Sequence, residues 1–363
     1  MNDFAIKIKP PSKPKAKKAL VPRVRIARWL FICAGSVFLM ALIGAITRLT
    51  ESGLSIVEWK PVTGALPPLN PAEWAKAFDA YKKSPQFLKV NSGMTLPEFQ
   101  RIFFWEWLHR LWGRVVVGVI YFVPLCWYWL RGALPSAAKP EFAFILLLGL
   151  GQGLMGWLMV KSGLVDQPAV SHYLLAAHLM LAFLIYAALF RLGLSFGLEP
   201  ERDAGRLTRL RGLTQLVLLL AVTTMIWGAF VAGLRAGLLY NDTFPMMGPY
   251  PWPMEGFQVS PPVLALFMEP ATVQFTHRVL AVVTFCAIML LFFRAGPFNP
   301  PPRLRRLFGT LAFMGFAQVG LGISTLLTHV NIIVATLHQA GALIILTLLV
   351  WLLHELPHIP EEK

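Results

Sequence analysis

The stretch EWLHR, Glu106 to Arg110, stands at the start of a long apolar run, and a near copy, QFTHR, Gln274 to Arg278, stands at the start of another. Both copies keep a histidine followed by an arginine, and only the first copy has a carboxylate three residues before the histidine. Ionisable side chains inside apolar runs are costly to bury and usually mark a functional site. The repetition therefore predicts a duplicated membrane fold with two related sites.

The composition is that of an integral membrane protein. Of 363 residues, 56% are hydrophobic and only 14% are charged, against about 25% charged in a typical soluble domain. Several apolar runs approach the ~20 residues that cross a bilayer as a helix, and a backbone in lipid must satisfy its own hydrogen bonds. We predict an all-α protein with eight spans, at residues 27–47, 105–130, 141–160, 171–193, 211–233, 271–294, 305–327 and 332–353.

Basic residues cluster at alternate ends of these spans. The net charge is +15, but the aromatic residues lie in the spans and not among the basic ones, so no nucleic-acid partner is predicted. The basic connecting segments include residues 1–26 and 191–211, and the positive-inside rule places them and both termini in the cytoplasm. Residues 1–26 have no signal- or transit-peptide pattern, and we expect a basic tail beside anionic lipid.

The two halves of the chain repeat each other. Gly44–Ile56 parallels Gly228–Tyr240, and the triad Gly149, Gln152 and Gly156 parallels Gly315, Gln318 and Gly322. Four spans in each half give both halves one orientation, which implies an axis along the membrane normal. The prediction is two four-helix bundles, 27–193 and 211–354, with a linker at 194–210 and a tail at 355–363. The repeated glycines favour either close helix packing or a flat wall for a planar ligand, and the two glutamines either interhelical hydrogen bonds or ligand contacts.

Four histidines belong to the repeated set: His109, His178, His277 and His338. Each stands about two turns from the outer end of its span, so the four are expected at similar depth. Two imidazoles facing each other across a helical bundle are suited to hold the iron of a haem. Zinc is disfavoured because no cysteine or further carboxylate accompanies them. The three cysteines Cys33, Cys126 and Cys286 have no metal-ligand spacing and are expected to be small buried apolar residues.

The side chains next to the histidines allow two interpretations each. Arg110 and Arg278 could extend to lipid headgroups or bind the carboxylates of a haem. Glu106 could be a carboxylate placed at a helix start by the helix dipole. Alternatively, since Gln274 is neutral at the equivalent position, Glu106 could mark one reactive site beside one passive site.

The long external loop 48–104 contains PAEWAKAFDAYKKSPQF, in which Trp74, Phe78 and Tyr81 have helical spacing. The pattern predicts an amphipathic helix at the interface. It fits either a surface helix packed on the bundle or a lid over a site below.

These features resemble the haem A synthase family, whose members convert haem O to haem A for cytochrome oxidases. The resemblance rests on RLTESGLSIVEWKPVTGALPP, EWLHRLWGR, SHYLLAAHL, VQFTHR and LHQ, in that order and spacing from about Arg28 onward. The absence of cysteine from loop 48–104 is similar to the proteobacterial and mitochondrial branch, and the short N-terminus favours a bacterial inner membrane. One departure is Glu269–Pro270, near which relatives often carry asparagine.

The resemblance implies roles for the repeated residues. His109 and His178 would hold haem O as the substrate, and His277 and His338 would hold a haem b cofactor. Glu106 matches the family's essential acidic residue, near a porphyrin methyl that is oxidised to a formyl group. A haem O synthase and an electron acceptor would be partners, and a homo-oligomer is compatible with the sequence. The alternative is a two-haem b-type electron-transfer cytochrome, which explains the histidines but not Glu106.

Overall fold

The computed structural model describes residues 22–60, 63–165, 168–201, 207–254, 256 and 261–356. Eight of its helical segments are long and apolar enough to cross a membrane, which confirms the predicted all-α membrane fold. The first half contains α1 (Arg23–Leu49), α4 (Leu96–Arg114), the π-helical η2 (Val115–Phe122), α5 (Val123–Leu130), α6 (Lys139–Ser162) and α7 (His172–Gly197). The second half contains α8 (Leu210–Gly233), α10 (Pro270–Ala295), α11 (Pro302–Leu327) and α12 (Ile332–Glu355).

Short helices connect the spans. They are η1 (Thr63–Ala65), α2 (Pro71–Tyr81), α3 (Pro85–Lys89), η3 (Ser136–Ala138), η5 (Ala236–Leu238), η6 (Pro262–Leu264), α9 (Ala265–Met268) and η7 (Gly296–Phe298). Most of the predicted tail 1–26, part of the linker 194–210 and the tail beyond residue 356 lie outside the described residues.

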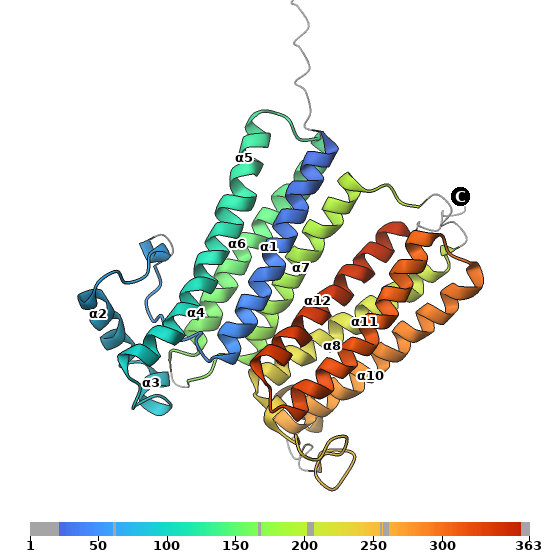
Figure 1. Cartoon of the computed structure of the whole chain (residues 1–363). Helices are drawn as coiled ribbons and strands as arrows, with labels where there is room; N and C mark the ends of the chain where they lie inside the picture. The colour runs from blue at the N-terminus through green and yellow to red at the C-terminus, as the bar shows by residue number, and fades with distance from the viewer. Residues whose placement is uncertain are drawn as a thin grey trace, which may run out of the picture.

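The two halves stand side by side, with α7 packed on α8 and α12, and α1 on α12 (Figure 1). The start of α1 and the end of α12 lie at one end of the bundles, and α2 and α3 lie at the other. We name these the terminal end and the loop end. Because α4, η2 and α5 form one continuous segment, each half contains four of the eight segments that are long and apolar enough to cross a membrane, and both halves run in the same direction.

Equivalent positions of the repeat meet between the halves at the loop end. Glu51 and Arg235 both have left-handed backbone angles, with φ of 55° and 53°, and their side chains form an ion pair at 2.8 Å. Nearby, a Cβ atom on Gly233 would lie 2.5 Å from Cβ of His172, so only glycine allows α7 and α8 to approach this closely. The halves are therefore tightly joined near a local pseudo-twofold axis.

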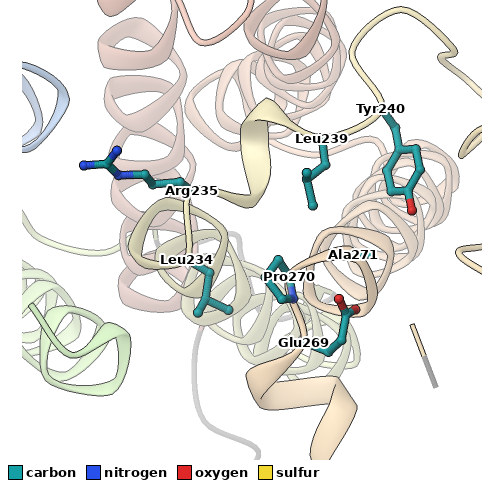
Figure 2. Close-up of a pocket in the computed structure, with 7 residues that line it drawn as sticks. All are labelled: Leu234, Arg235, Leu239, Tyr240, Glu269, Pro270 and Ala271. Carbon is teal, nitrogen blue, oxygen red and sulfur yellow. The ribbon is translucent and has the colours of Figure 1, made fainter. Parts of the chain in front are cut away.

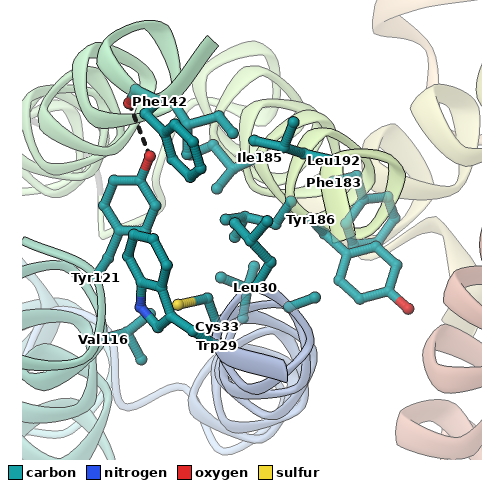
Figure 3. Close-up of a cluster of buried hydrophobic side chains, with 14 of the residues drawn as sticks. Trp29, Leu30, Cys33, Val116, Tyr121, Phe142, Phe183, Ile185, Tyr186 and Leu192 are labelled. Carbon is teal, nitrogen blue, oxygen red and sulfur yellow. Dashed lines mark hydrogen bonds between the residues drawn. The ribbon is translucent and has the colours of Figure 1, made fainter. Parts of the chain in front are cut away.

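The terminal end of the first half is filled by aromatic side chains (Figure 3). Trp29 stacks on Tyr121 and Phe142, with ring centroids 5.5 and 5.6 Å apart. Pro124 has no N–H to donate to the carbonyl of Ile120, and Trp29 Nε1 donates to that oxygen at 2.8 Å instead. A tertiary hydrogen bond thus satisfies the carbonyl that Pro124 leaves free, and it joins α1 to the second span.

The cysteine prediction is only partly correct. Cys33 is buried in this core, Cys126 is half-buried, and Cys286 is exposed on the outside of α10. Thiols are apolar enough for a lipid-facing position, so an apolar run does not by itself determine whether a cysteine faces the core.

The second span begins earlier than predicted. Thr95 N–H bonds the Glu98 carboxylate at 2.8 Å in a capping box, and this cap starts α4 at Leu96 instead of at residue 105. The additional turns carry Phe99 and Phe103, which pack against Phe78 of α2. The predicted amphipathic helix is therefore present, ends at Tyr81, and packs beside α4 as a surface helix.

Tyr81 belongs to the same buried aromatic cluster as Phe78, Phe99 and Phe103. Its side chain is fully buried, and burial raises the pKa of its hydroxyl, which keeps it neutral. The hydroxyl donates to Gln86 at 3.1 Å, and the Gln86 amide donates to the carbonyl of Glu51 at 2.9 Å. The loop helices are thus tied to the turn that follows α1.

The last helix extends one residue into the predicted tail. The Glu355 carboxylate is fully buried, lies 3.1 Å from Arg303 and accepts from the backbone N–H of Glu201 at 2.8 Å. Because a buried carboxylate is stable only with such partners, Glu355 belongs to the second half and holds the linker against it.

Candidate functional site

The structure pairs the four histidines as the repeat predicts. His109 on α4 and His178 on α7 lie close enough to interact electrostatically, and so do His277 on α10 and His338 on α12. All four histidines are only partly buried although each lies well inside its helix. Two imidazoles facing one space is the arrangement that a six-coordinate haem needs.

Each histidine ring lies against a glycine of a neighbouring helix. A Cβ atom would stand 2.8 Å from Cε1 of His109 if built on Gly44, and 3.0 Å from Cε1 of His178 if built on Gly156. In the second half, Gly228 lies against His277 and Gly322 against His338, both at 3.0 Å. Real Cβ contacts are longer than this, so the glycines provide the room in which the imidazoles are held edge-on.

The hydrogen bonds of the histidines favour iron ligation through Nε2. His277 Nδ1 lies 3.1 Å from the carbonyl oxygen of Thr224, which can only accept, so the proton is on Nδ1 and Nε2 carries the lone pair. Nδ1 of the other three histidines is buried without a hydrogen-bond partner in the described structure. A ring whose Nδ1 is set against protein keeps Nε2 for a ligand, which is the nitrogen that would hold a haem iron.

Glu106 is buried, at 2% exposure, and both its oxygens are engaged. Oε2 accepts from Ser55 Oγ and from the backbone N–H of Ile56, each at 2.7 Å. Oε1 lies 2.5 Å from Arg110 Nη2. The carboxylate and guanidinium together are electrically neutral, which allows a charge to stay at this depth.

Gln274 occupies the equivalent place with opposite polarity. Its Nε2 donates to the carbonyls of Ala236 and Leu239 at 2.8 and 2.7 Å, and its Oε1 accepts from Arg278 at 3.0 Å. The turn after α8 thus presents carbonyls where the turn after α1 presents an N–H and a hydroxyl. The carboxylate and the amide are each matched to their own loop, so the acid cannot be exchanged freely between the halves.

The two arginines bind loop backbone in this structure. Arg110 Nη2 donates to the carbonyl of Ile56 at 2.9 Å, and its guanidinium lies 5.5 Å from the ring centroid of Trp59. Arg278 Nη1 donates to the carbonyl of Pro245 at 3.2 Å. Both arginines join the loop-end turns to the histidine helices, a role that neither sequence interpretation included.

Two hollows open at the loop end. The larger, about 460 Å³, lies over the second half between the turn after α8 and the start of α10, and its lining includes Arg235, Tyr240 and Glu269 but none of the four histidines (Figure 2). Glu269 also accepts from Thr272 N–H at 2.7 Å, so Glu269–Pro270 is a capped helix start. The smaller, about 80 Å³, lies in the first half, and its lining combines Arg110, Lys161 and Glu58 with apolar side chains.

The structure places Glu106, His109, His178 and Arg110 in the first half and His277, His338 and Arg278 in the second, and the sequence did not predict the partners of these side chains. Gly44 and Gly228 stand at the first position of one duplicated segment, and the duplication itself could have identified them. Ser55 and the N–H of Ile56 carry no signal in sequence, because their role depends on how the turn folds onto α4.

The fold and the site define a multi-pass membrane protein with two duplicated halves, each holding a pair of glycine-backed histidines. The profile of the COX15-CtaA family, described as cytochrome oxidase assembly protein, matches residues 27–350, and the chain belongs to this family. Heme A synthase of Rhodospirillum centenum is 48% identical over 363 aligned residues, covering 99% of this chain and 95% of that protein. Heme A synthase of Nitrosospira multiformis is 46% identical over 91% of this chain and 93% of its own length. Heme A synthase COX15 of Homo sapiens is 40% identical over 93% of this chain and 83% of its own length.

Proposed function

We propose that this chain is a haem A synthase, a membrane oxidoreductase that converts a porphyrin methyl group of haem O to the formyl group of haem A. The names and coverage of its relatives support this activity. The structural observation that carries it is the doubled histidine site with a carboxylate, Glu106, in one copy and an amide, Gln274, in the other. An electron-transfer cytochrome would need no such difference.

In this proposal the two halves bind different haems. His109 and His178 hold haem O as the substrate, and His277 and His338 hold haem b as the resident cofactor. The bound iron porphyrins supply the redox chemistry, and an electron acceptor and a haem O synthase are the partners. The loop end then faces the periplasm of a bacterial inner membrane, with both termini in the cytoplasm.

Glu106 would act from its anchored position. The bonds from Ser55 and Ile56 hold the carboxylate in one orientation, so its negative charge is available without reorganisation when positive charge develops near the substrate methyl. The same carboxylate could orient a water molecule as a general base. Arg110, which lines the small hollow with Lys161 and Glu58, and Arg278 in the second half would each release one guanidinium N–H from a loop carbonyl to a haem propionate.

Production of haem A in cells tests the proposal. The chain is co-expressed with a haem O synthase in a host that lacks haem A, and the pigments are extracted and separated. We expect haem A, together with haem b bound to the purified protein. Haem b at both sites with no haem A, even when haem O is abundant, would instead identify the cytochrome.

The glycine beside His277 offers a second test. Gly228→Ala should lower haem b occupancy by roughly threefold, because the added Cβ at 3.0 Å forces the ring from its rotamer. Gly212→Ala is the matched control on the same helix, since nothing lies within 4 Å of its Cβ position. Both changes favour the helix itself by roughly 0.5–1 kcal/mol. Equal haem b content in the two variants, measured from the reduced absorption spectrum, would exclude the packing role of Gly228.

A further inference from the structure

Each half has one glutamine that reaches the histidine of the neighbouring helix. Gln152 on α6 donates from Nε2 to the carbonyl of His178 at 3.0 Å, and Gln318 on α11 donates to the carbonyl of His338 at 2.9 Å. These bonds fix which end of each amide carries the nitrogen, because a carbonyl oxygen can only accept. The two glutamines are equivalent up to this point.

Only Gln152 also approaches the ring nitrogen that would bind iron. Its Nε2 lies 3.3 Å from His178 Nε2, whereas Gln318 forms only the carbonyl bond among the described residues. Since the amide nitrogen is a donor, it pairs with the lone pair of His178 Nε2, and that lone pair is the one an iron would use.

The difference has a steric origin three residues after each histidine. The second half has Gly341 there, and a Cβ on it would stand 2.1 Å from Oε1 of Gln318. Gln318 therefore fills the space that a side chain would otherwise occupy. The first half has Leu181 at the equivalent position, packed against the core, and a Cβ in the place that Gly341 leaves empty would exclude a glutamine positioned like Gln318.

We propose that Gln152 is an internal competitor for the iron-binding nitrogen of His178, which makes the first site exchange its haem while the second site retains its own. The Gln152 amide, 3.3 Å from Nε2, would use the lone pair that an iron would need, so the hydrogen bond and the iron bond would exclude each other. Binding displaces this hydrogen bond and release restores it. This inference rests on the proposed function, in which the first site must release a product and the second keeps a cofactor.

Haem transfer to apomyoglobin measures the competition without assaying catalysis. The purified full chain, loaded with its haems, is mixed with excess apomyoglobin, and the loss of each haem is followed by its absorption. Gln152→Leu should slow haem loss from the first site about fivefold, the equilibrium effect of one hydrogen bond, with haem b loss unchanged. Leu181→Gly should act in the same direction, because it gives Gln152 the space that Gln318 uses.

Two variants of the second half separate competition from packing. Gln318→Leu removes the hydrogen bond to the carbonyl of His338 and no bond to His338 Nε2. The change in the rate of haem b loss therefore measures the effect of the carbonyl bond, which both halves share. Gly341→Ala should accelerate haem b loss, because the Cβ expels the Gln318 amide from its space.

The outcomes distinguish this inference from the function on which it rests. Equal first-site rates in Gln152→Leu and the wild type would overturn the competitor role, even if haem A is made normally. Haem b at the first site with no haem A would overturn the proposed function, yet a slower loss from that site in Gln152→Leu would still support the competition. A wild-type first site that binds no haem would overturn both.

Discussion

Replacing Glu106 with glutamine is expected to lower haem A formation about 100-fold, the scale on which a positioned acid–base group acts, while haem stays bound. The carboxylate accepts from Ser55, Ile56 and Arg110 on two oxygens. An amide has only one oxygen, so in either orientation its N–H₂ group faces a donor. The histidines are untouched, which is why the haem spectrum should persist when conversion stalls.

Haem A and haem O extracted from the same cells give the measurement. Accumulated haem O with haem-loaded protein supports the assignment, and normal haem A output from Glu106→Gln would remove Glu106 from the chemistry. Gln274→Glu is the matched change in the other half. It turns carboxylate oxygens toward the carbonyls of Ala236 and Leu239, so it should weaken haem b binding and should not create a second active site.

Removing one histidine is expected to empty only the half that contains it. His338→Ala should reduce haem b occupancy at least about tenfold, because losing an outer-shell partner of a ligand already costs about that much, and should leave haem O bound. His178→Ala should do the reverse. The physical reason is the pairing of each histidine with the other histidine of its own half.

Pigment extraction from each purified variant distinguishes the two haems. His329→Ala is the control, because that ring is largely exposed and pairs with Asp242, and it should retain both pigments. Loss of both haems from His338→Ala alone, with the fold intact by circular dichroism, would contradict two independent sites.

The sequence predicted most of the frame because the bilayer restricts it. Apolar length determines the spans, and the repeat places four histidines on them. The sequence-based predictions were wrong where a local helix cap or the packing of a helix face decided the structure. The cap at Thr95 extends α4 into the predicted loop, and Cys286 faces outward although its run is apolar. Neither feature changes the hydrophobicity of the segment, so neither could be read from it.

The sequence by itself determined the eight helices, their duplication, the paired histidines and the single acid among them. These features depend on residue type and spacing along one chain, and a helix converts spacing directly into position. Only the tertiary structure decided what holds Glu106, since the polarity of the turns after α1 and α8 comes from backbone orientation. It also decided that Gln152 reaches His178 Nε2 while Gln318 forms only the bond to the carbonyl of His338, because the space that Gln318 occupies depends on Gly341 of another helix.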